Sequence, residues 1–333
     1  MSIDLMTIVS AEVALFLIIL LGVWIRYSGY LDGVVEGRIF KLIVHYIWPC
    51  FVFSKIAMVS ELGSAGKILF LPLLGIGSVL VGLSLGWLLL KVLPKRWLPS
   101  DGSIATFLVC VAFYNYGFLP IPLMETLFPE AGGSSQLSQL LIFGFGVELT
   151  AWTVGYSLMN RNCNKHWWQK GINPPSVAIV LAVLCNTSGV SQWIPQGLFD
   201  GVTKIGTLGI PLALLLIGST IYGIFEETRN AFCWKEFFRV TAIVASLRIV
   251  VLPLLFLGYT YCFLAEDTTL KMILALEAAM PCAMFPILFS RHFDGDVQFA
   301  FYAVSGTTLL SVITTPLWLV IGFTWLGLGL SFG

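Results

Sequence analysis

The chain has 333 residues, of which 58% are hydrophobic and only 11% are charged, and its formal net charge is zero. A typical soluble domain is about 25% charged, so this composition excludes a water-soluble globule, and the balanced charge does not indicate a nucleic-acid partner. The seven cysteines are scattered along the chain, in a pattern typical of neither a disulfide framework nor a zinc site. No cofactor and no metal site are expected.

In chain order, the apolar residues form ten blocks of about 20 residues, the length that a helix needs to span the hydrocarbon of a bilayer. The blocks cover residues 5–26, 38–59, 67–92, 102–127, 138–160, 173–192, 197–223, 236–262, 268–290 and 297–326. Backbone groups cannot remain unpaired in lipid, so each block is predicted to be a helix. Residues 1–4 contain no basic residue, which predicts a retained first helix and not a cleaved signal peptide. The predicted fold is an all-α integral membrane protein with ten transmembrane helices.

Lysine and arginine gather in the loops, with their flanks, that follow the odd-numbered spans. These loops hold 13 of the 18 basic residues, namely Arg26, Arg38, Lys41, Lys91, Lys95, Arg96, Arg161, Lys165, Lys170, Arg229, Lys235, Arg239 and Arg291. Basic loops mark the cytoplasmic side of a membrane protein. Both termini are therefore predicted to lie outside the cytoplasm. Without an organelle-targeting segment in view, a cell (inner) membrane is expected.

Five spans in each half predict two repeats of opposite orientation, because an odd number of crossings inverts the second copy. Weak sequence echoes support a duplication. Asn115 precedes Pro120 by five residues in the fourth span, as Pro281 precedes Pro286 in the ninth. Prolines in spans 2 and 7 also stand about half a chain length apart, namely Pro49 and Pro211.

The prolines of spans 4 and 9 predict interrupted helices. Proline removes a backbone N–H and clashes with the preceding turn, and the freed groups must find protein, water or a ligand at membrane depth. Inverted repeats with interrupted helices at matching positions are typical of secondary transporters, whose half-helix N-termini suit anionic groups. Two crossed interruptions therefore predict a polar centre between the two halves.

These interruptions resemble those of the auxin efflux carrier family. The first reads NYGFLPIP at residues 115–122, and the second reads AAMPCAMFP at residues 278–286. The likeness continues through WTVG at 152–155, NPP at 173–175, LGIPLALLLIG at 208–218 and LRIVVLP at 247–253. The chain is similar to a bacterial member, because the long cytoplasmic loop of many plant members is replaced by a short connection at residues 161–172.

The resemblance implies a division of the chain and a site. Residues 1–160 and 173–333 would form the two five-helix repeats, with spans 1, 2, 6 and 7 as a scaffold and spans 3–5 and 8–10 as a moving transport part. Spans 4 and 9 would cross where a substrate anion binds, as in the similar architectures of sodium/proton antiporters and bile-acid symporters. The resemblance also implies a homodimer through the scaffold.

The crossing supplies the candidate substrate-binding residues, which are Asn115, Tyr116, Gly117, Pro120, Pro281, Cys282 and Pro286. The Asn115 amide can donate to a carboxylate and also accept from a backbone N–H, so ligand contact and helix capping are both expected of it. The prolines are expected to be architectural. Pro120 stands where plant members usually have glycine, and Cys282 stands where they often have glutamine. The resemblance therefore implies organic anions as a class of substrate and not auxin itself.

Ionisable residues inside the spans are a second candidate group, because charges at membrane depth are usually paired or functional. Arg248 and Glu277 are expected to form an ion pair, with a proton- or substrate-linked role as the alternative. Glu148 stands where plant members carry a support-site glutamine, and an interaction with Lys67 that changes with protonation is expected. His45 is predicted to be a buried neutral histidine bonded to a carbonyl, with a proton relay as the alternative.

The sequence therefore predicts a secondary active transporter of a small organic anion, a carboxylate or an auxin-like weak acid, working by alternating access at the crossing. A sodium-coupled symporter of the bile-acid-symporter type is the alternative, and a membrane sensor or subunit is a third class. An enzyme is not expected, because no His-Glu-x-x-His zinc motif occurs.

Overall fold

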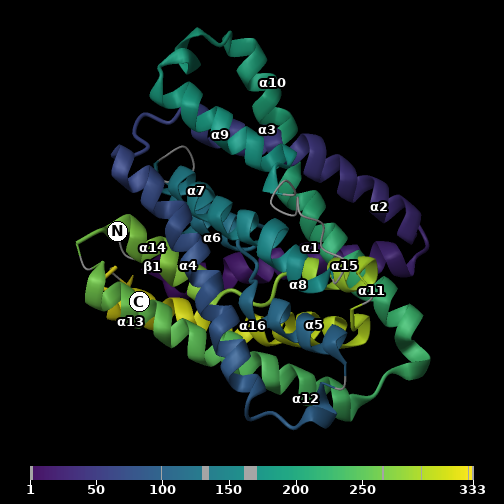
Figure 1. Ribbon diagram of the computed structural model, residues 1–333. Coiled ribbons are helices and arrows are strands. Elements are labelled where there is room, and N and C mark those ends of the chain that lie inside the picture. Colours follow the sequence, from purple (N-terminus) through teal and green to yellow (C-terminus); the bar gives the residue numbers. More distant parts are fainter. Residues whose placement is uncertain are drawn as a thin grey trace.

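A computed structural model describes residues 3–98, 100–129, 135–160, 171–264, 266–293, 295–328 and 330–331. Apart from loops and turns, the described chain is helical, with two two-residue strands, β1 (Ile3–Asp4) and β2 (Leu330–Ser331). These strands pair in parallel, with Ile3 opposite Leu330. The two ends of the chain therefore lie side by side (Figure 1).

Seven helices in the described part of the chain are long and apolar enough to cross a membrane. Three are α1 (Leu5–Tyr27), α4 (Ala65–Leu90) and α16 (Val297–Trp325). The pair α10 (Gln196–Thr207) and α11 (Gly209–Thr228) runs on into a 3-10 turn at Arg229–Ala231. The fold is thus that of a multi-pass membrane protein.

The other three long helices each contain a π-helical turn. The first joins α2 (Gly33–Leu42) to α3 (Trp48–Ala57) through Ile43–Ile47. The second joins α7 (Ser135–Thr150) to α8 (Tyr156–Met159) through Ala151–Gly155. The third joins α12 (Trp234–Ala245) to α13 (Leu252–Phe263) through Ser246–Val251. Pro49 and Pro253 begin the segments after two of these turns, where a missing N–H is tolerated.

The remaining three predicted spans are divided into shorter helices, so the structure does not confirm ten continuous crossings. Residues 102–127 form α5 (Asp101–Ala112) and α6 (Pro120–Leu127), and residues 268–290 form α14 (Thr268–Ala279) and α15 (Phe285–His292). Residues 173–192 form α9 (Pro174–Thr187) and a 3-10 turn at Val190–Trp193, and another such turn lies at Lys95–Trp97. The predicted interruptions in the fourth and ninth spans are confirmed.

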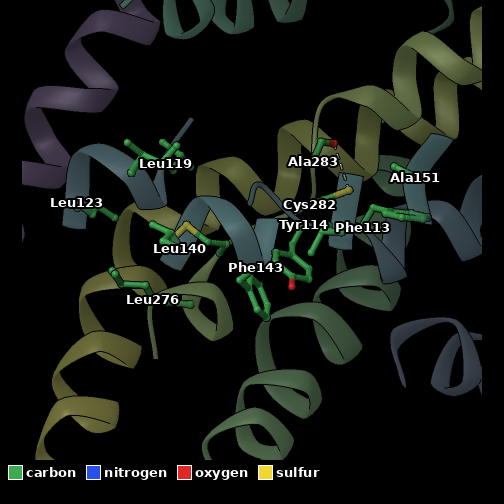
Figure 2. Close-up of a cluster of buried hydrophobic side chains, with 14 of the residues drawn as sticks. Phe113, Tyr114, Leu119, Leu123, Leu140, Phe143, Ala151, Leu276, Cys282 and Ala283 are labelled. Carbon is green, nitrogen blue, oxygen red and sulfur yellow. Dashed lines mark hydrogen bonds between the residues drawn. The ribbon is translucent and has the colours of Figure 1, made fainter. Parts of the chain in front are cut away.

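The two interrupted segments cross each other. Phe113 and Met280, which follow α5 and α14, both have extended backbone, and Tyr114 forms an antiparallel bridge with Cys282. Asn115 N donates to Pro281 O at 3.0 Å, and Ala283 N donates to Phe113 O at 3.0 Å. Figure 2 shows Phe113 and Tyr114 beside Cys282 and Ala283. Each interruption therefore satisfies backbone groups that the other leaves open at membrane depth.

The helices pack closely through small residues. α1 packs against α11, α3 against α9 and α10, α4 against α7, and α12 against α16. At the first of these contacts, a Cβ on Gly218 would lie 1.8 Å from Ile19 O and a Cβ on Gly22 would lie 2.0 Å from Leu215 O. Only glycine allows this approach, as is typical of helix pairs in lipid. Figure 1 shows α9 and α10 at one edge of the molecule and α12 and α13 at the opposite edge.

Candidate functional site

A cavity of about 130 Å³ lies at the crossing of the two interrupted segments; we call it the central cavity. Much of its wall is aromatic, with Phe40, Trp48, Tyr114, Tyr116, Phe118, Trp152, Phe285 and Phe289. An apolar cavity of about 150 Å³ is large enough to hold benzene. The central cavity therefore has room for a molecule with a single ring.

A second hollow of about 160 Å³ continues from the central cavity. The two share Phe40, Ile43, Phe118, Met284 and Leu288. The far end of the second hollow is lined by two charge pairs, Arg26 with Glu36 and Arg291 with Glu227. A path thus leads from the crossing toward basic residues at the ends of α1 and α15.

Asn115 is at the centre of the crossing and is buried. Its Oδ1 accepts a hydrogen bond from Leu119 N at 3.3 Å, just before α6 begins, and the residue also lines the central cavity. This bond reaches the N–H of the residue before the helix, and α6 has no side-chain cap, so the predicted capping role is not borne out; the contact of Asn115 with a ligand stays a prediction. Gly117 lines the cavity as well, and a Cβ there would lie 3.3 Å from the Trp48 ring. The glycine therefore leaves room for the indole to form part of the cavity wall.

The other predicted substrate-binding residues divide into two groups. Tyr116 lines the central cavity. Pro120 and Pro286 stand in the first turns of α6 and α15, where proline favours helix initiation. Pro281 supplies the carbonyl that pairs with Asn115, and Cys282 is buried opposite Tyr114. These four residues, Pro120, Pro281, Cys282 and Pro286, build the crossing but do not line the central cavity.

The ends of the half-helices set the electrostatics of the central cavity. The central cavity is lined by residues at the N-terminal ends of two helices. Gly117 and Phe118 lie next to the start of α6, and residues 283–285 lie at the start of α15. A helix N-terminus carries a partial positive charge that favours anions. The cavity thus receives positive potential from the backbone, although no lysine, arginine or histidine of the described chain lines it.

Arg248 does not pair with the carboxylate of Glu277, which corrects the expected ion pair. The buried guanidinium donates from Nε to Met280 O and from Nη2 to Glu277 O, each at 3.0 Å, and lies 4.3 Å from the centre of the Tyr114 ring. Both Glu277 carboxylate oxygens are buried without a hydrogen-bond partner in the described structure. Arg248 instead caps the C-terminal end of α14, where open carbonyls and the helix dipole attract a cation.

Lys67 pairs with Asp267 and not with Glu148, a second correction. Lys67 Nζ lies 2.6 Å from Asp267 Oδ2. The Lys67 and Gln139 side chains both approach Gly63, so the lysine lies beside Gln139 of α7. Glu148 is about nine residues, or roughly 13 Å, further along α7 than Gln139. Burial opposes ionisation of Asp267, but hydrogen bonds from Lys67 and the Leu270 backbone outweigh it and hold the pKa of this carboxyl below its usual value of 3.8.

His45 is exposed on the outer surface of the π-helical turn and not buried as predicted. The expected bond to a carbonyl is confirmed, because Nδ1 lies 2.9 Å from Lys41 O, one turn earlier. The prediction of burial was wrong because hydropathy does not fix which side of a helix faces its neighbours. A histidine on the outer surface has no route to the central cavity.

Several charged contacts could not be anticipated from the sequence. Lys55 of α3 pairs with Glu125 of α6 at 2.7 Å, and Arg291 of α15 pairs with Glu227 of α11. Nothing in the sequence links these residues except their places at helix ends. Glu148 was identified as a candidate, but its position in the wall of the central cavity emerged only from the structure.

A family of known proteins matches nearly all of the chain. The family described as "membrane transport protein" matches residues 7–166 and 160–319. The chain is similar to an uncharacterized transporter of Methanothermobacter thermautotrophicus, with 23% identity over 314 residues that cover 92% of this chain and 96% of that protein. It is also similar to an uncharacterized transporter of Schizosaccharomyces pombe, with 24% identity over 209 residues, or 56% of this chain and 45% of that protein.

Proposed function

Because the chain belongs to the membrane transport protein family, the group related to auxin efflux carriers, we propose that it moves a small organic anion across the membrane by alternating access at the crossing. The substrate is a carboxylate of about the size of a single ring. The observation that carries this proposal is the central cavity, where Asn115 and the N-terminal ends of α6 and α15 converge.

These groups suit an anion. The positive ends of two half-helices meet at one small cavity, and backbone N–H groups at helix N-termini are a common means of binding carboxylates. Arg248 caps the negative end of α14 from behind the Tyr114 ring, so the field of that carbonyl end is neutralised. An amide such as that of Asn115 adds a directional donor.

The packing supports a scaffold of spans 1, 2, 6 and 7 and a transport part of spans 3–5 and 8–10. Close contacts join α1 to α11 and α3 to α9 within the proposed scaffold, and α4 to α7 and α12 to α16 within the proposed transport part. The central cavity has walls from both, including Trp48 of the first and Asn115 of the second. Movement of one part against the other would expose the cavity to each side in turn.

The positive-inside rule assigns the basic residues Arg26 and Arg291 to the cytoplasm. The second hollow leads to these residues, so the proposed state is open to the cytoplasm, with both termini outside it in a cell (inner) membrane. A homodimer through the scaffold is part of the same proposal, by analogy with the family.

The test is uptake of labelled benzoate and phthalate into proteoliposomes that contain the purified protein. Asn115→Asp keeps the oxygen that accepts from Leu119 N but replaces the donor amide by a negative charge, so uptake should fall at least tenfold while the protein stays folded. Asn230→Ala, in an exposed turn, is the matched control and should transport normally. Normal uptake by Asn115→Asp would refute the site, and uptake that requires a sodium gradient would support the sodium-coupled alternative.

A further inference from the structure

Glu148 is the carboxylate in the wall of the central cavity. It is 4% exposed, and among the described residues of that wall it is the one acidic side chain, with no basic side chain beside it. The Asn173 amide approaches it but lies outside hydrogen-bond geometry. It also lines a smaller hollow of about 10 Å³ next to the cavity, together with Trp48 and Tyr116.

The groups that face Glu148 offer no counter-charge. From the crossing come Tyr114, Asn115 and Tyr116, and from α9 come Asn173 and Pro175. The residues that could carry a positive charge are engaged elsewhere: Lys67 with Asp267, Arg248 with carbonyls behind the Tyr114 ring, and His45 with a carbonyl on the outer surface. Glu277 of α14, which packs against α7, is a second buried carboxylate without a hydrogen-bond partner in the described structure, and it offers no positive charge. An ionised Glu148 would therefore stand alone in an aromatic cavity.

We propose that Glu148 carries a proton together with the substrate, so that each anion crosses the membrane with one proton held on this carboxyl. The inference rests on the proposed function. A lone ionised carboxylate in an apolar site is costly and is usually neutralised. An anion about 5 Å away would add like-charge repulsion that weakens its binding on the order of 100-fold. Protonation of Glu148 removes both costs, so the proton and the anion bind cooperatively, each favouring the other.

The proton balance of the cycle is simple. When the cavity is open to one side, Glu148 takes a proton from that water and the anion enters. After the change of access the anion leaves, the carboxyl releases its proton to the second side, and the empty protein returns with Glu148 ionised and hydrated by water in the cavity. A monovalent anion and one proton move together, so no net charge crosses the membrane.

The first experiment compares Glu148→Gln with Glu12→Gln in proteoliposomes. Glu12 is also buried in a span, with one unpartnered carboxylate oxygen, but it does not line the central cavity. The probe is labelled benzenesulfonate, which stays ionised at every pH used and does not cross lipid as a neutral acid. In the native protein and in Glu12→Gln, an inward proton gradient should raise uptake at least tenfold, and a membrane potential should not affect it.

Glu148→Gln should transport without response to the proton gradient and with a new dependence on membrane potential. Uptake by Glu148→Gln that still follows the proton gradient and ignores the potential would overturn the proposal. A second result would also overturn it: the native protein takes up benzylammonium and Glu148→Gln does not. The carboxylate would then act as an ionised counter-charge for a cation. If native uptake of the anion is independent of pH, this inference fails alone; if no anion is bound or moved, the proposed function fails with it.

A binding measurement covers the case in which Glu148→Gln folds but does not transport. The affinity of the native protein for benzenesulfonate should rise about tenfold for each unit of pH lowered through the titration of Glu148, with one proton taken up per anion bound. Binding by Glu148→Gln should not depend on pH. Equal pH dependence in both proteins would overturn the assignment of the proton to this residue.

Discussion

Replacing Arg248 by methionine tests what stabilises the interruption in the ninth span. The buried guanidinium makes two hydrogen bonds, to the carbonyls of Glu277 and Met280. A hydrogen bond from a charged donor contributes about 1.5–3 kcal/mol, so Arg248→Met should lower the free energy of unfolding by roughly 3–6 kcal/mol, less the relief of removing a buried charge. The loss arises because two buried carbonyls remain without a donor.

The matched variant is Glu277→Gln, which separates this account from a carboxylate ion pair. Both Glu277 oxygens lack a hydrogen-bond partner in the described structure, and the backbone carbonyl that Arg248 binds is kept, so Glu277→Gln should destabilise the protein clearly less than Arg248→Met does. The assay is the apparent Tm of purified protein from tryptophan fluorescence, at one scan rate because unfolding of such proteins is often irreversible. The reasoning is refuted if Glu277→Gln destabilises as much as Arg248→Met, or if the effect of Arg248→Met vanishes in the Glu277→Gln background.

Two further predictions concern helix ends and helix contacts. Asp267→Asn keeps an N-cap residue for α14 but removes the partner of Lys67. The pKa of Asp267 is lowered in the folded protein. The stabilisation from this carboxylate is therefore present above the ordinary pKa of 3.8 and is lost as the pH falls through the lowered pKa. The apparent Tm of native protein should therefore exceed that of Asp267→Asn at pH 7, and the difference should shrink as the pH falls below 3.8. A difference of zero at pH 7 would contradict the ion pair. Gly218→Val should prevent the close approach of α11 to Ile19, 1.8 Å from the added Cβ, and abolish the monodisperse peak in size-exclusion chromatography. Gly77→Val, with no neighbour within 4 Å, is the control and should behave as the native protein does.

Much of the fold was predictable because insertion into lipid depends on local properties of the chain. Apolar blocks must form helices wherever they meet hydrocarbon, and the structure has helices in all ten predicted blocks, although only seven are long and continuous. The interruptions at residues 113–119 and 280–284 were predicted from Pro120 and Pro286, since proline fixes where a helix can begin. The same local chemistry predicted a helix cap at Asn115, but its Oδ1 accepts from Leu119 N, before the first turn of α6.

Pairings between side chains were predicted less well. Arg248 was assigned to the carboxylate of Glu277 because both lie at similar depth, but the arginine meets the backbone of α14 instead. Lys67 was assigned to Glu148 from family positions, but its side chain reaches Asp267, the N-cap of α14. These errors have one cause: depth along a helix can be counted from the sequence, whereas rotation and neighbours cannot.

The sequence by itself determined that this protein lies in a membrane, that two of its helices are broken, and that Asn115 stands at one break. These features depend on hydropathy and on the backbone chemistry of proline, which act over a few residues. The family resemblance implied that the breaks cross, but only the tertiary structure decided which backbone groups pair there, that a cavity with aromatic walls forms, and that Glu148 is the acid in its wall. Those results require segments that are distant in the chain to meet, and the side-chain geometry that decides such meetings is not written in any one segment.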